Sequence, residues 1–248
     1  MKCIAVKTSA RVCGMAALGM MTGQCWAFDL TIDTGQRGVG PIELAALLTL
    51  ITLAPAILIM LTSFTRIVIV LSLLRQALGL QQTPPNMVIS GLAMFLTALV
   101  MAPTWQRIQA SALEPYMAGR MTPEVAIQTA EVPLRDFMLH QTRPADLAMA
   151  RQLMTKSNAV VTDSDVRRLP FYALVPAFIS SELTSAFRVG FLIYLPFLVI
   201  DLVTSAVLMA LGMFMLPPAT ISIPLKLLIF TLASGWPLLL GNLAASFA

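Results

Sequence analysis

Long apolar runs, interrupted by prolines and by a few charges, dominate the pattern of the chain. The first run begins at Ile42 and continues to Leu74, and the second covers about Asn86–Ala102. Two more cover about Ala173–Leu211 and Thr220–Phe247. A run of about 20 apolar residues is long enough for a helix to span a bilayer. We therefore expect four membrane-type helices in two long hairpins, residues 42–103 and 171–248.

Prolines predict where these helices turn and bend. Two consecutive prolines cannot lie inside a helix, so Pro84-Pro85 and Pro217-Pro218 mark the turns of the two hairpins. Single prolines predict kinks at Pro55, Pro176, Pro196, Pro224 and Pro237. A straight helix over 42–74 would be about 50 Å long, against about 30 Å of bilayer hydrocarbon. We expect that helix to tilt, break or stand partly outside the bilayer.

Residues 104–170 have a different pattern. Charges of both signs alternate there with apolar residues at helical spacing, such as Val125, Val132 and Phe137. Thr122 before Pro123 is a favourable helix start, and Arg143-Pro144 indicates another. The pattern predicts a small helical domain inserted between the hairpins.

Composition fits a polytopic all-α membrane protein. The 248 residues are 58% hydrophobic and 11% charged, with a mean hydropathy of +0.83. Soluble domains have about 25% charged residues. The net charge of +4 comes without a basic block, so we expect no nucleic-acid partner.

The first 27 residues have the layout of a secretory signal peptide. Lys2, Lys7 and Arg11 precede a short apolar run, and Ala27 is a small residue at a plausible cleavage point. A first membrane helix or lipidation at Cys25 is less favoured. Cleavage would leave a polar segment, residues 28–41, at a periplasmic N-terminus, and no cysteine. Residues 104–170 and the C-terminal end would then be periplasmic, and the two hairpin turns cytoplasmic.

The sequence contains no pattern typical of an enzyme or a metal site. His140 is the one histidine, and neither a phosphate-binding loop nor a nucleophile elbow is present. We expect no catalysis, no cofactor and no metal.

Charges inside the apolar runs are candidates for assembly contacts. They are Glu182, Arg188, Asp201 and Lys226. Because unpaired charge at membrane depth is costly, we expect them to pair within or between subunits, and we favour Glu182 with Lys226. That pair requires the third helix to fold back near Pro196. The alternative is that each charge pairs with another subunit or reaches the membrane surface.

Several strings carry a family resemblance: Phe64–Gly79, Thr83–Asn86, Pro176–Gly190, Leu195–Leu202 and Met213–Pro218. In order and spacing they closely resemble the FliP family of flagellar type III export-gate proteins, which has injectisome relatives. The signal peptide resembles that of the flagellar branch.

The resemblance implies that several copies assemble with FliQ-like and FliR-like subunits into a helical, pore-bearing ring. That ring lies in the bacterial inner membrane at the flagellar basal body, with much of the chain on the periplasmic side. It works with other export apparatus proteins, and unfolded flagellar subunits pass through it. The resemblance also implies a gate at the second hairpin turn, made by Met209, Met213, Phe214 and Met215. The family often has consecutive methionines there, and this chain departs from it at Phe214.

Two other functions fit the pattern of broken, charged helices: a secondary transporter of a small solute, and a structural subunit of a secretion apparatus without a pore role. The two hairpins show no internal repeat that would support the transporter. Solute uptake by the isolated protein would favour the transporter, and a stable multi-subunit complex would favour the gate.

Overall fold

A computed structural model describes residues 45, 48–49, 51–53, 56, 59–80, 83–156 and 169–247. Within these residues the structure consists of helices and turns, without strands. The predicted signal peptide and residues 28–41 lie outside them. The chain divides into two units, Met1–Ala46 and Leu47–Ala248, and the helices below belong to the second.

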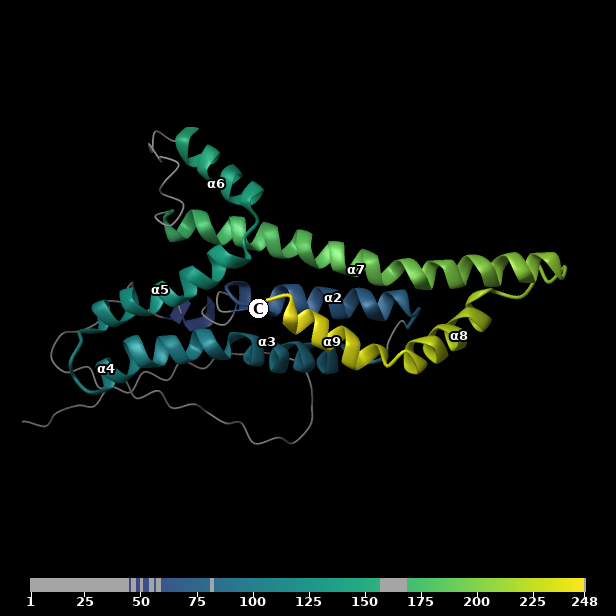
Figure 1. The fold of residues 1–248 in the computed structure, drawn as a ribbon, viewed down its shortest axis with the longest axis horizontal. Coiled ribbons are helices and arrows are strands. Elements are labelled where there is room, and N and C mark those ends of the chain that lie inside the picture. Colours follow the sequence, from purple (N-terminus) through teal and green to yellow (C-terminus); the bar gives the residue numbers. More distant parts are fainter. Residues whose placement is uncertain are drawn as a thin grey trace, which may run out of the picture. The chain divides into compact units, whose positions relative to one another are not determined.

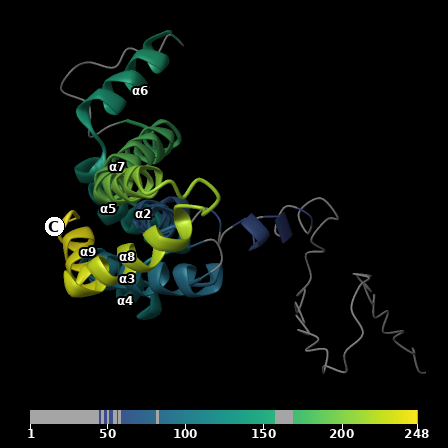
Figure 2. The ribbon, with the colours of Figure 1, turned by 90° about the vertical axis from the view of Figure 1, so that its right-hand side faces the viewer.

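Helix α2 (Phe64–Ala77) forms the centre of the second unit. Its buried residues Ile67, Val70, Leu71 and Leu74 follow the i, i+3, i+4, i+7 pattern of a single helix face. Figures 1 and 2 show α2 between α7 on one side and α3 with α9 on the other. The long helix expected over 42–74 is broken at the turn 61–63, just before α2.

The second helix is longer than the sequence predicts. It comprises α3 (Asn86–Ile108), the π-helical turn η1 (Gln109–Leu113) and α4 (Glu114–Met117). The predicted end at Ala102 is wrong, because the helix continues through Pro103. A proline removes one hydrogen bond without ending a helix whose neighbouring bonds hold. The wider π turn ends at Leu113, two residues before Pro115.

Helices α5 (Pro123–Gln141) and α6 (Pro144–Lys156) begin where the sequence predicts, after Thr122 and Arg143. Both pack against α7, and α5 also packs against α3. An apolar cluster joins α5 and α6 to α7, and the rings of Phe137 and Phe178 meet edge to face at 6.0 Å between centroids. The charged central region is therefore packed onto the first half of α7.

Helix α7 (Phe171–Ala210) is the longest element. Its 40 residues are about 60 Å long at 1.5 Å per residue. The helix is continuous through Pro176 and Pro196. Gly190 allows α7 to lie close to α2, since a Cβ atom there would be 2.2 Å from Leu73 Cδ1.

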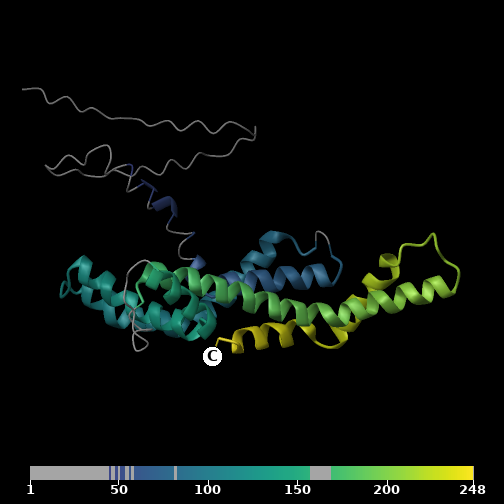
Figure 3. The same cartoon turned by 90° about the horizontal axis from the view of Figure 1, so that it is seen from above.

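The last helical run is bent into α8 (Ala219–Leu232) and α9 (Gly235–Ala245), at an angle of 65°. The bend at Ala233–Ser234 lies one turn before Pro237. In a straight helix the Pro237 ring would clash with the carbonyl of residue 233, so the helix bends there. Pro224, where a kink is also expected, lies inside α8 without ending it. Figure 3 shows α8 leaving the far end of α7 and α9 turning back beside its middle.

Two of the described helical runs are long and apolar enough to cross a membrane: Asn86–Met117 and Phe171–Ala210. The bent pair α8 and α9 makes a third if it acts as a single span. Helix α2, with 14 residues, is about 21 Å long and too short alone. Four expected spans thus correspond to two or three among the described residues.

Candidate functional site: buried ion pairs and the methionine turn

The centre of the structure contains a buried ion pair between α2 and α7. Arg66 Nε donates to Glu182 Oε2 at 2.9 Å, and Arg66 Nη2 donates to Oε1 at 2.5 Å. Glu182 is 0% exposed and Arg66 is 5% exposed. This two-point geometry is the strongest form of the arginine–carboxylate contact. The pair joins α2 to α7, and its two residues are 116 positions apart in the sequence.

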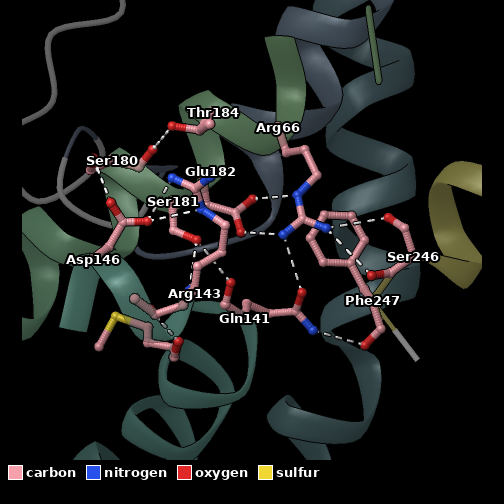
Figure 4. Close-up of polar contacts among 12 residues, drawn as sticks. Arg66, Gln141, Arg143, Asp146, Ser180, Ser181, Glu182, Thr184, Ser246 and Phe247 are labelled. Atoms are coloured by element: carbon pink, nitrogen blue, oxygen red, sulfur yellow. Dashed lines mark hydrogen bonds and ion pairs between the residues drawn. The ribbon is translucent and has the colours of Figure 1, made fainter. Parts of the chain in front are cut away.

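Arg66 also contacts α5 and the residues that follow α9 (Figure 4). Its Nη2 donates to Gln141 Oε1 at 3.2 Å, and its Nη1 donates to the carbonyl and hydroxyl of Ser246 at 3.4 and 3.3 Å. The ring of Phe247 lies 4.0 Å from the guanidinium carbon, within cation–π distance. Gln141 Nε2 donates to the Phe247 carbonyl at 3.2 Å. Four separate segments thus meet at a single cation.

A second polar group lies beside Glu182, where α5 passes into α6. Ser181 Oγ donates to the Gln141 carbonyl at 3.2 Å and accepts from the Arg143 amide at 3.0 Å. Asp146 accepts from Arg143 Nε at 3.0 Å and from Ser180 Oγ at 3.2 Å. These contacts fix the α5–α6 junction against the turn of α7 that carries Glu182.

The second ion pair joins α7 to α8. Lys226 Nζ lies 2.6 Å from Asp201 Oδ2 and donates to the Ala77 carbonyl at 3.1 Å. Ala77 ends α2, where carbonyls lack helical partners, so Lys226 also caps that helix. Lys226 is 4% exposed, whereas the Asp201 side chain is 42% exposed. Water can solvate the Asp201 carboxylate but not the Lys226 ammonium. Lys226 therefore depends on Asp201 for its counter-ion.

The expected Glu182–Lys226 pair is wrong. Because α7 does not fold back at Pro196, Glu182 and Asp201 lie about 28 Å apart along the helix. Lys226 meets Asp201, and Glu182 meets Arg66. Arg188 differs from the other three charges because it is exposed, and it has no ion pair among the residues that the structure describes.

The methionine turn lies at the end of α7 that is farthest from α5 and α6 (Figure 1). Gly212 adopts φ +74°, which allows the tight turn after Ala210. Met209, Met213, Phe214 and Met215 are exposed there, Met215 at 98%. The predicted gate residues are together and uncovered in the single chain.

Sequence reasoning missed three participants in the central network: Gln141, Ser246 and Phe247. They carry no distinctive sequence signal, since they are common residues at helix ends. Arg66 did have a signal, because it is a charge inside an apolar run, but the charges singled out from the sequence all lie in the second hairpin. Within the described ranges, no group of three His, Cys, Asp or Glu residues is close enough to hold a metal ion.

Comparison with known proteins identifies the family. A sequence model described as the FliP family matches residues 47–243. The chain is 50% identical over 213 residues to the flagellar biosynthetic protein FliP of Pectobacterium carotovorum, covering 86% of this chain and 81% of that protein. The Bacillus subtilis protein of the same name is 46% identical, with 83% and 91% covered. The one from Aquifex aeolicus is 41% identical, with 92% and 95% covered. The chain belongs to the FliP family.

Proposed function

We propose that the chain is a subunit of the flagellar type III protein export gate, in the bacterial inner membrane at the flagellar basal body. Copies of it, with FliQ-like and FliR-like subunits, form the channel through which unfolded flagellar subunits cross the membrane. Family membership supports this proposal over a secondary transporter, since relatives with 41–50% identity are named as flagellar biosynthetic proteins.

The proposed assembly is supported mainly by the large apolar side chains that are exposed along α7. Large apolar side chains are exposed from its first turn to the turn beyond it, as at Tyr172, Phe191, Leu202 and Leu211. At about 60 Å, α7 is about twice as long as the bilayer hydrocarbon is thick. Lipid alone cannot cover it, and soluble surfaces rarely expose so much apolar area. Neighbouring subunits therefore cover part of α7.

Arg188 supports the same assembly. It lies exposed on α7 among apolar residues and is without an ion pair in the described part of the chain. A cation on a covered apolar surface is costly unless an acidic group meets it. An acidic group of a neighbouring subunit is the partner that this position requires. Glu182, Asp201 and Lys226 act differently, by holding the helices of one subunit in place.

The methionine turn is the proposed gate. Met209, Met213 and Met215 are flexible side chains that repack at little cost, and Phe214 is a stiffer side chain among them. Several copies in a ring would close a pore to ions and yield to an unfolded chain. Residues 104–170 lie on the periplasmic side in this arrangement, together with much of the remaining chain.

The test of the gate replaces Met213, Phe214 and Met215 with alanine, in cells that also express the partner subunits. We expect the assembled complex to leak small ions, measured as membrane conductance. A matched variant carries Phe95→Ala and Met117→Ala, which remove exposed side chains on α3 and α4 and should leave the membrane tight. A fully assembled gate variant that stays as tight as the parent would place the seal elsewhere.

The broader function is tested separately by complementation. A strain that lacks its own FliP should regain swimming and export of filament subunits when it receives this chain with the FliQ and FliR of its source. Membrane insertion without export of any flagellar subunit would contradict the proposed function. That result is independent of how the methionine turn behaves.

A further inference from the structure

Helix α9 is attached to the rest of the structure in an unusual way. At its start, Ala233–Ser234 makes a 65° bend, and Ser234 adopts φ +50°, which side-chain-bearing residues rarely do. Of its eleven residues, only Leu239 and Leu243 are buried. Burial of apolar side chains therefore contributes little to holding α9 against the rest of the structure.

Apolar cavities lie on both sides of α9. A cavity of about 320 Å³ separates Trp236 and Leu240 from residues of α2 and α3, including Leu71 and Val88. Another of about 290 Å³ separates Leu239 and Leu243 from α2 and α7. Both cavities are partly open to the surface, so side chains of α9 lose close contacts with α2, α3 and α7 along these flanks.

The far end of α9 is held by polar contacts and by a cation–π contact. Ser246 accepts two hydrogen bonds from Arg66, and the Phe247 carbonyl accepts one from Gln141. The Phe247 ring covers the Arg66 guanidinium at 4.0 Å. Figure 4 shows Ser246 and Phe247 on the side of Arg66 opposite Glu182. The Arg66–Glu182 pair does not use Ser246 or Phe247 as a partner of its carboxylate.

We propose that α9 is an arm that pivots at Ala233–Ser234 and is latched by Ser246 and Phe247 onto the Arg66–Glu182 pair. In the latched form the arm lies over the cavity that Leu71 and Leu74 line. In the released form that cavity is open, while the Arg66–Glu182 pair stays intact. The latch gives the subunit two conformations without breaking its central ion pair. This inference does not depend on a channel function.

Hydrogen–deuterium exchange on the full chain in detergent tests the arm. Phe247→Ala and Ser246→Ala remove separate latch contacts, and each should accelerate exchange of the α9 amides about tenfold or more. Amides of α2 and α7 should keep their parent rates. Phe247→Leu keeps most of the apolar volume and removes the ring, so it gives the same α9-specific change without risk to folding. Phe95→Ala is the matched control, because that exposed ring lies on α3.

Two results would overturn the proposal. Equal acceleration in α2, α7 and α9 would mean that α9 belongs to the same cooperative unit as the core and does not pivot. Unchanged exchange in α9 with all three variants would mean that Ser246 and Phe247 do not hold it. The expected result is faster exchange of the α9 amides alone, and the acceleration should be larger when a variant removes more of the latch contacts.

Discussion

Removing one member of the Arg66–Glu182 pair should be far more damaging than removing both. Glu182→Met leaves a guanidinium that is 5% exposed without its carboxylate, and breaking a buried pair in this way costs about 3–5 kcal/mol. Arg66→Met strands the fully buried Glu182 at a similar cost. In a chain of this size, about 1 kcal/mol shifts Tm by about 2–4 °C. Each single variant should therefore lose roughly 6–20 °C.

The double variant should recover most of that loss. Two methionines fill the space of the pair without a buried charge, and such replacements are often neutral. The residual cost is about 1–2 kcal/mol, because Gln141 and Ser246 lose the Arg66 donor and the Phe247 ring loses its cation. The coupling free energy between the two sites should thus exceed about 2 kcal/mol.

The assay is thermal unfolding in detergent, followed by the fluorescence of Trp105 and Trp236 in the four proteins of the double-mutant cycle. Arg143 and Asp146 supply a comparison pair that is only partly buried, because their side chains are 43% and 10% exposed. That pair should couple less strongly than Arg66 and Glu182, because solvent screens the exposed guanidinium. If the losses of Arg66→Met and Glu182→Met simply add in the double variant, the pair is not the source of stability that we infer.

Two further predictions concern the other helix contacts. Asp201→Ala should lower Tm more than Arg188→Ala, because it leaves Lys226, which is 4% exposed, without its counter-ion, at about 1–3 kcal/mol; equal unfolding curves would contradict this. Gly190→Ala places a Cβ 2.2 Å from Leu73 Cδ1 and 3.1 Å from its Cβ, and should cost about 1–3 kcal/mol. Gly91→Ala is its control, because no atom lies within 4 Å of the added carbon, and it should be neutral or stabilising by up to about 1 kcal/mol; a Gly190→Ala protein as stable as Gly91→Ala would refute the close approach.

The sequence predicted which segments are helical better than where they end. Starts that depend on local chemistry were confirmed, as at Thr122-Pro123 and Arg143-Pro144. The end expected at Ala102 was wrong, because a long apolar helix tolerates the loss of one hydrogen bond at Pro103. The paired prolines Pro217-Pro218 did mark a turn: they lie between α7 and α8, and α8 begins directly after them.

The partners of the buried charges could not be predicted from spacing along the chain. Glu182 and Lys226 were correctly singled out as costly charges, but pairing depends on which helices lie side by side. That arrangement follows from the close approach of α2 to α7 at Gly190 and from a continuous α7. Neither is visible in the residues that surround the charges. The role of the methionine turn remains a proposal, because it depends on subunits that surround the single chain.

The separation of Arg66 from its partners affects how the chain is made. Glu182 follows Arg66 by 116 residues, and Ser246 follows it by 180. At about 5–20 residues per second of synthesis, Arg66 waits about 6–23 s for its carboxylate. A guanidinium without a partner stays in water or at the membrane surface during that interval. Helix α2 therefore takes its final position only after the first half of α7 has been made, so the first hairpin cannot be completed independently of the second.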